Sequence, residues 1–309
     1  MATRRDFLKS TSLLTLGALA SCANGAEAGQ KAQPVIGSKN CGLQLYSLGP
    51  ELGKDVAGGL KRLKEFGYNN VELVGFKDDT ISNMPAADFK KLCDDAGLKI
   101  LSSHCNPPVR EYTKDNKAEV LEYWKKTAAG HAAIGCPYLV QPGLPQTRSE
   151  EETKFVAEVF NEAGQIAKAE GVKWGYHNHE MEFAKVVPGG TESKFGRRVN
   201  EGKAIEEIFI ENTDPENVLF ELDVYWTVMG QHDPVEFINK YANRIQLLHI
   251  KDVMVLGESG MMNFENIFNA FYANGHKDWF VEIEGTQSGI QFDRVKASAD
   301  FLYRSDFVK

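Results

Sequence analysis

The chain has 309 residues, a length that allows either two small domains or one large α/β barrel. Hydrophobic residues make up 42% and charged residues 25% of the chain, which excludes a disordered protein and one with many membrane spans. The net charge of -8 provides no basic surface for a phosphate backbone, so we expect no nucleic-acid partner.

The N-terminal segment has the pattern of an export signal and not of a folded domain. Arg4 and Arg5 precede an apolar run of small residues over 13–20, as in twin-arginine signals. This run is too short to span a membrane. The tripeptide Leu-Ala-Ser before Cys22 resembles a lipobox, which predicts that Cys22 carries a lipid.

We therefore expect two parts: a signal and tether over 1–38, and a folded body over 39–309. Export by the twin-arginine route would place the protein in the periplasm, attached to the membrane only through the lipid on Cys22. Cleavage after Ala26 or Ala28 is the alternative, and it would discard Cys22. The other cysteines fit neither a disulfide scaffold nor a zinc motif and are expected to be buried thiols; they are Cys41, Cys93, Cys105 and Cys136.

Short apolar runs alternate with longer segments of helical periodicity throughout the body. Eight runs are predicted to be strands: 41–46, 70–74, 99–104, 138–141, 172–177, 218–223, 244–250 and 279–284. The helical segments end at turn residues such as Gly67 and Gly97, and Asp233 before Pro234 marks the start of a helix. This alternation predicts a single-domain (β/α)8 TIM barrel. A doubly wound sheet is the alternative, but no glycine-rich phosphate loop follows the first run.

Polar residues gather at the ends of these predicted strands, where barrel enzymes build their active sites. In chain order they are Gln44 and Tyr46, Glu72, His104, Gln141, His177 and His179, Glu221 and Asp223, His249, and Glu282 and Glu284. Side chains two apart on a strand point to the same face, so each pair can face the barrel interior. Carboxylates and imidazoles converging on one mouth favour a divalent cation, because unpaired buried charges are costly.

Several segments of the body resemble the xylose isomerase-like TIM barrels, the broad sugar phosphate isomerase/epimerase family. The similar segments are 42–47, 67–73, 175–183, 221–226, 249–252 and 280–282. The similarity is strongest to a subgroup with a His-Asn-His-(Asp/Glu) motif, which here begins at His177. The resemblance implies a small carbohydrate substrate and a divalent ion, which is Mn, Co, Zn or Mg in this family.

The resemblance also implies the metal ligands, one of which departs from the family pattern. By position they are His177, Asp223, His249 and Glu282. His177 stands where relatives often have a glutamate, which favours Zn, Co or Mn over Mg if the imidazole is a ligand. Alternatively, Glu180 or Glu182 folds back to bind the ion, and His177 becomes a base or a substrate contact.

The remaining polar residues receive catalytic and substrate-binding roles. The candidate catalytic residues are His177, Glu282 and Lys251, with Glu284 competing for the role of Glu282. The candidate substrate-binding residues are Gln44, Tyr46, Glu72, His104, His179 and Trp226. Of these, Glu72 and His104 either contact the substrate or orient the metal ligands.

The sequence thus predicts an exported, metal-dependent sugar isomerase or epimerase that transfers protons at carbons next to hydroxyl or carbonyl groups. Two alternatives remain: a lyase or hydrolase of an oxidised (keto) glycoside, and a lipoprotein that binds a sugar without chemistry. A metal-dependent endonuclease is disfavoured by the acidic charge balance. A homo-oligomer is compatible with the sequence.

Overall fold

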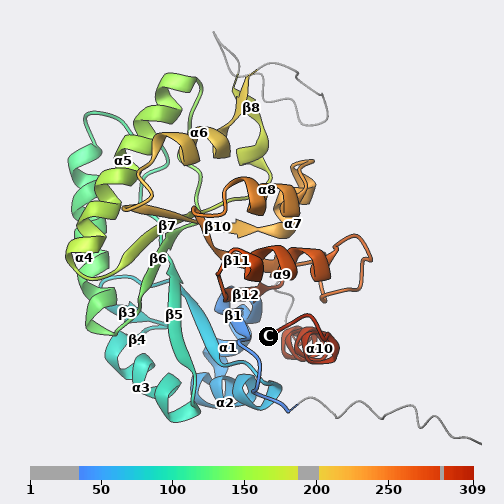
Figure 1. The fold of residues 1–309 in the computed structure, drawn as a ribbon. Helices are drawn as coiled ribbons and strands as arrows, with labels where there is room; N and C mark the ends of the chain where they lie inside the picture. Colours follow the sequence, from blue (N-terminus) through green and yellow to red (C-terminus); the bar gives the residue numbers. More distant parts are fainter. Residues whose placement is uncertain (1–34, 187–201, 286–288) are drawn as a thin grey trace, which may run out of the picture. The chain divides into compact units, whose positions relative to one another are not determined.

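The computed structural model describes residues 35–186, 202–285 and 289–309 (Figure 1). Residues 34–309 form one compact unit. The predictions on the export signal, including Arg4, Arg5 and the lipid on Cys22, lie outside the described residues. Within the described part, no helix is long and apolar enough to cross a membrane.

Eight parallel strands close into a barrel, as the sequence predicted. Its strands are β1 (Gly42–Gln44), β2 (Asn70–Val74), β5 (Lys99–His104), β6 (Tyr138–Gln141), β7 (Lys173–His177), β10 (Val218–Asp223), β11 (Ile245–Lys251) and β12 (Asp278–Glu282). Closure occurs at β1, where Gly42 pairs with Asn70 on one side and with Phe280 on the other. A Cβ at Gly42 would lie 2.5 Å from the Trp279 carbonyl oxygen, so this close approach requires glycine.

Helices surround the strands and complete the (β/α)8 fold (Figure 1). They are α1 (Pro50–Lys54), α2 (Val56–Phe66), α3 (Ala86–Ala96), α4 (Lys117–Ala133), α5 (Glu150–Ala169), α6 (Ile205–Asn212), α7 (Val224–Met229), α8 (Pro234–Lys240), α9 (Phe264–Ala273) and α10 (Gln291–Arg304). The connections also carry the 3-10 helices η1 (Leu45–Leu48) and η2 (Met181–Phe183), and the hairpins β3 (Thr80–Ile81) with β4 (Met84–Pro85) and β8 (Lys185–Val186) with β9 (Lys203–Ala204).

The boundaries of the helices follow from local chemistry. Asp233 caps α8 by accepting a hydrogen bond from the Val235 amide at 2.7 Å, and Pro234 occupies the first helical position. At its other end, α2 stops at Gly67, whose φ of 102° lies in the left-handed region. The four cysteines of the described residues are free, buried thiols, as expected.

The interior of the barrel changes from apolar to polar along the strands. Leu219, Leu247 and Phe280 belong to a small apolar cluster. Two residues further along the same three strands lie Glu221, His249 and Glu282, all buried. Because residues two apart share a face, the apolar cluster forms a floor below these polar side chains. The polar groups are therefore placed at the carboxyl ends of the strands.

Candidate metal centre

Four side chains from consecutive strands of the barrel form a group that could hold a metal ion. His177 ends β7, Asp223 ends β10, His249 lies in β11 and Glu282 ends β12. Each offers one ligand atom, and these atoms lie within 4.8 Å of one another. None of the four residues is more than 8% exposed. The structure thus brings together the four ligands that the sequence predicted.

Asp223 has one carboxylate oxygen engaged and one available. Its Oδ1 caps α7 by accepting a hydrogen bond from the Trp226 amide at 2.9 Å. Its Oδ2 is buried and accepts no hydrogen bond from any described residue. Lys251 Nζ lies 3.8 Å from this Oδ2 atom. A buried carboxylate oxygen without a donor fits a cation site, because leaving it unpaired costs free energy.

Two further carboxylates hold the imidazoles of the group. Glu72 accepts a hydrogen bond from His249 Nε2 at 2.6 Å and from Gln44 Nε2 at 2.9 Å. Glu221 lies 3.2 Å from His177 Nδ1, its hydrogen-bond partner. Such partners fix the tautomer and orientation of an imidazole and leave its other nitrogen for a metal ion. The sequence placed Glu221 at a strand end but gave it no role.

A second group of possible donors overlaps the first. It consists of His104, His177, Glu221 and His249, whose ligand atoms also lie within 4.8 Å of one another. His104 Nε2 lies 2.7 Å from Glu221 Oε2 and 3.4 Å from Glu72 Oε2. Neither Glu180 nor Glu182 belongs to either group of described donors.

Burial and neighbouring charges shift the pKa values of several groups in the cluster. Burial, followed by the neighbouring Glu72, raises the pKa of Glu221 to about 7. Burial likewise raises the pKa of Asp223 to about 6. Burial lowers the pKa of His177 well below its usual value, and His249 and His104 lower it further, which favours the neutral imidazole that a ligand requires. Burial would also lower the pKa of His249, but Glu221 and Glu72 raise it overall, so a metal ion would displace a proton from this imidazole.

Lys251 lies beside the carboxylates of β12 and does not line the cleft described below. Its Nζ donates to Glu282 Oε2 at 2.9 Å and also contacts Glu284. Burial alone would lower the pKa of Lys251, but Glu282 and Asp223 raise it overall, so the ammonium stays charged. The Trp226 ring covers this ammonium, with 4.8 Å between Nζ and the ring centroid.

Glu182 is occupied elsewhere. Its Oε1 accepts a hydrogen bond from the Tyr176 hydroxyl at 2.5 Å, and its Oε2 accepts one from the His179 amide at 2.9 Å. The side chain is fully buried, and burial raises its pKa to about 7. Glu182 therefore holds the backbone of His179 in place, and His177 fills the fifth-strand position in the group of four.

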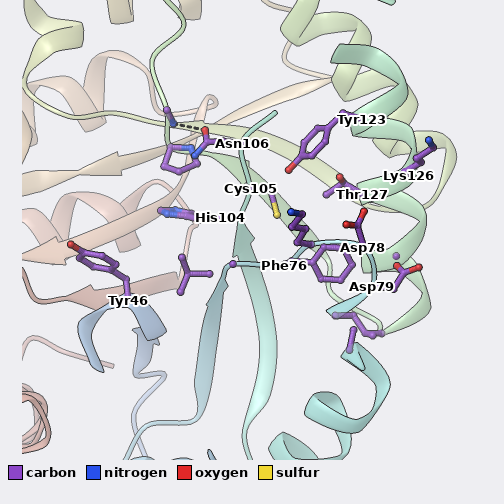
Figure 2. A pocket seen from close by; sticks show the side chains of 18 of the residues that line it. Tyr46, Phe76, Asp78, Asp79, His104, Cys105, Asn106, Tyr123, Lys126 and Thr127 are labelled. Carbon is purple, nitrogen blue, oxygen red and sulfur yellow. Dashed lines mark hydrogen bonds between the residues drawn. The ribbon is translucent and has the colours of Figure 1, made fainter. Parts of the chain in front are cut away.

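A cleft of about 1610 Å³ opens at the mouth of the barrel (Figure 2). At the metal centre it is lined by Tyr46, His104, His177, His179, Glu282 and Glu284. Two residues predicted to bind substrate do not line it: Gln44 and Glu72 are completely buried and hydrogen-bonded to each other. Trp226 does not line it either, because its ring packs over Lys251. Gln141, another polar residue at a strand end, does not line the cleft. Its Oε1 accepts a hydrogen bond from the Tyr112 hydroxyl at 2.8 Å.

Comparisons with known proteins agree with this architecture. The family model described as "Xylose isomerase-like TIM barrel" matches residues 60–305. A crystal structure of a sugar phosphate isomerase/epimerase from Parabacteroides distasonis shares 48% identity and a TM-score of 0.82, covering 88% of this chain and 100% of that one. D-psicose 3-epimerase from Clostridium cellulolyticum shares the fold at 13% identity and a TM-score of 0.65, covering 85% of this chain and 97% of its own.

Curated relatives carry a different activity in their name. Inosose dehydratase from Clostridium tetani is 26% identical over 156 residues, which cover 43% of this chain and 47% of the relative. The chain thus spans about half the length of the curated relatives it matches. The match across most of the barrel and the closed eight-stranded sheet show that this chain belongs to the xylose isomerase-like TIM barrel family.

Proposed function

We propose that the protein is a metal-dependent lyase that removes a proton next to the carbonyl of a cyclic keto carbohydrate and expels an oxygen substituent from the adjacent carbon. A divalent ion held by His177, Asp223, His249 and Glu282 would stabilise negative charge on the substrate oxygen. The observation that carries the proposal is the unlike surroundings of two imidazoles on the cleft wall, His104 and His179.

His104 is built as a proton donor. It lies 2.7 Å from Glu221 and 3.4 Å from Glu72. Burial would lower its pKa, but Glu72 and Glu221 raise it overall, which favours the imidazolium. An imidazolium beside the cleft can protonate a leaving oxygen.

His179 is built as a proton acceptor. Its backbone amide is held by Glu182, and burial followed by the charge of Lys251 lowers its pKa, which favours the neutral imidazole. A neutral imidazole in the cleft can take the proton from carbon. Groups whose surroundings separate their pKa values suit a reaction that needs one acid and one base.

This asymmetry favours elimination over epimerisation. Two-base epimerisation needs bases on opposite faces of one carbon. The carboxylates that line the cleft at the metal centre lie on one side, because Glu282 ends β12, Glu284 comes two residues later and both contact Lys251. The dehydratase relatives support elimination. Epimerisation remains the second candidate, because the 48% identical structure carries the isomerase/epimerase description.

Incubation with inosose in deuterated water tests the proposal. The protein is loaded in turn with Mn, Co, Zn or Mg, and the products are analysed by mass spectrometry. A lyase yields a product that has lost one water, whereas an epimerase yields one of unchanged formula with one deuterium on carbon. Neither change with any ion would contradict both enzyme readings and leave a sugar-binding protein. The Asp223→Ala variant controls for catalysis without the centre.

We also propose that the protein is exported by the twin-arginine route and anchored in the periplasm through Cys22. The support is the Arg4-Arg5 pair, the short apolar run and the lipobox-like sequence. A Cys22→Ser variant should move from the membrane fraction to the soluble periplasmic fraction with its metal content unchanged. A variant that stays with the membrane would contradict the anchor.

A further inference from the structure

The cleft extends well beyond the metal centre. Its outer part, which we call the side arm, runs between the connection that follows β2 and one face of α4 (Figure 2). The side arm is lined by Phe76, Asp78, Asp79, Tyr123, Lys126 and Thr127. A pocket that encloses one small molecule measures about 300–1,000 Å³. The whole cleft, at about 1610 Å³, has room for more than the reacting ring.

The side arm exists because the outer ring of helices is open at this point. Helix α3 packs against α2, and α4 packs against α5, but α3 and α4 make no comparable contact among the described elements. The connection from β2 to α3 instead carries the β3–β4 hairpin. Asn106 and Cys105, which directly follow β5, line the passage from His104 to the side arm.

The wall of the side arm is held in an unusual backbone conformation. Asp78 and Asp79 have φ values of 48° and 56°, in the left-handed region that residues other than glycine seldom adopt. On α4, a Cβ at Gly130 would lie 2.6 Å from Asp79 Oδ1 and 2.6 Å from the Phe76 ring. The absence of a side chain at Gly130 therefore lets this connection lie against the helix. Strained backbone of this kind is commonly kept where a binding site needs it.

The chemistry of the side arm fits a neutral, hydroxyl-rich ring. Tyr123 is half-buried and supplies an aromatic ring on which the C–H face of a sugar can pack. Phe76 also lines the side arm, but it is buried, with its ring 4.2 Å from the His131 ring between centroids. The carboxylates of Asp78 and Asp79 can accept hydrogen bonds from hydroxyl groups, and the Thr127 hydroxyl can donate and accept. Lys77 and Lys126 also line this part of the described cleft, and their charges offset those of Asp78 and Asp79. Glu122 lies 3.6 Å from Lys126. The side arm therefore has no excess of positive charge to select a phosphate group.

We infer that the side arm binds a second sugar ring, joined to the ring that reacts at the metal centre. The full substrate is then a two-ring carbohydrate, of which a one-ring compound such as inosose supplies only the part that reacts at the metal centre. The inference rests on the proposed function for the identity of the first site, and it assigns the remote part of the same substrate. Contacts in the side arm would supply binding free energy far from the reacting carbon.

Binding of one-ring and two-ring probes to the metal-loaded protein tests the side arm. The probes are methyl β-D-glucopyranoside, cellobiose and maltose, and calorimetric titration gives each Kd. We expect at least one disaccharide to bind about tenfold tighter than the one-ring probe, a difference of about 1.4 kcal/mol. Equal affinities, or no binding of either disaccharide, would overturn the inference.

Two variants of α4 locate the effect. Ala129 is exposed and lines the side arm, so Ala129→Trp fills it. Lys125 is exposed on the same helix and does not line the cleft, so Lys125→Trp is the matched control. The disaccharide preference should disappear in Ala129→Trp and persist in Lys125→Trp. A preference that survives in Ala129→Trp overturns the inference.

Failure of the inference is distinguishable from failure of the proposed function. Turnover of inosose, a one-ring compound, depends on the metal centre and not on the side arm. A protein that prefers disaccharides but gives no deuterium exchange or water loss retains the side arm and contradicts the lyase proposal. If the protein turns inosose over but shows no preference for disaccharides, the lyase proposal stands and the inference about the side arm is wrong.

Discussion

Buried carboxylates occur in two regions of this barrel, and the pKa values of Glu282 at the mouth and Glu206 on α6 are shifted in opposite directions. At the mouth, Glu282 lies 2.9 Å from Lys251 Nζ and 3.2 Å from His249 Nδ1. Burial would raise its pKa, but Lys251 and His249 lower it overall. On α6, Glu206 is fully buried, and neither of its carboxylate oxygens has a hydrogen-bond partner among the described residues. Burial, followed by Glu182, raises the pKa of Glu206 well above its usual value.

The difference shows that burial alone does not identify a catalytic carboxylate. The mouth combines carboxylates, imidazoles and an ammonium with access to the cleft. Glu206 lines no part of that cleft and belongs to neither group of metal donors. We therefore assign metal binding to the mouth and expect Glu206 to be protonated and without a role in the reaction.

Deleting a donor at the mouth should have the largest effect. Asp223→Ala and His249→Ala each remove one of the four ligands, so each variant should lose its bound metal, and turnover should fall to background. Elemental analysis after dialysis measures the metal, and circular dichroism shows whether the variant is folded. Glu206→Gln, the matched change in the other region, should keep its metal. Full metal content in both mouth variants would refute the site.

Removing the carboxylate that holds His177 should have a smaller effect. Glu221→Gln replaces the carboxylate 3.2 Å from His177 Nδ1 and 2.7 Å from His104 Nε2. Loss of such a partner typically weakens metal affinity by about 10–100-fold. Titration against a competing chelator measures this affinity. A loss as complete as that of Asp223→Ala would show that Glu221 is itself a ligand, and unchanged affinity would contradict its orienting role.

Exchanging the unusual ligand should change selectivity more than occupancy. His177→Glu introduces the carboxylate that the family resemblance implies at this position, so we expect metal to be retained with preference moving toward Mg by about tenfold, since imidazole suits Zn, Co and Mn. Competition between Mg and Mn for the purified protein gives the ratio. If His177 acts as a base, the preference stays the same and turnover falls. If neither changes, His177 is only a packing residue.

Most of the fold could be predicted because each strand and helix carries its own signal. All eight barrel strands lie within two residues of the predicted ranges at each end. The largest differences are at the ends of β1 and β12, each of which stops two residues early; β1 was predicted to reach Tyr46 but ends at Gln44. There the Gln44 side chain accepts a hydrogen bond from the Tyr46 amide at 3.0 Å and starts the turn of η1. A single capping contact of this kind leaves no periodic pattern in the sequence, so the end of β1 could not be predicted from it.

The residues of the site that stand at strand ends could be predicted from the sequence. How deeply each polar side chain is buried, and how the segments between strands and helices fold, could not. Alternation along strands places His177, Asp223, His249 and Glu282 on one mouth. The sequence did not show which of the polar residues would line the cleft. Glu72 is buried and holds His249, and Gln44 in turn holds Glu72, so neither side chain reaches the cleft. The side arm depends on the separation of α3 from α4 and on left-handed backbone, neither of which the sequence pattern expresses.

The smallest expected effect concerns stability and belongs to α6. Because the pKa of Glu206 is raised in the folded protein, its carboxylate opposes folding once the pH exceeds the unfolded value of about 4.3. Glu206→Gln removes this opposition. The free energy of unfolding of the variant, relative to the native protein, should therefore increase as the pH rises from about 4.5 toward 8. Urea unfolding at a series of pH values measures the difference.

The neighbouring Glu207 provides a control of opposite sign on the same helix. Burial would raise its pKa, but the Lys240 ammonium, 2.6 Å from Glu207 Oε1, lowers it overall. Its carboxylate therefore favours folding above the unfolded pKa, and this contribution is lost as the pH falls through the folded value. Between about pH 4.5 and 8, Glu207→Gln should be less stable than the native protein by a constant amount, and this deficit should shrink only at lower pH. A stability difference for Glu206→Gln that is equally constant over this range would contradict the assignment of Glu206 as a carboxyl group buried without a cation.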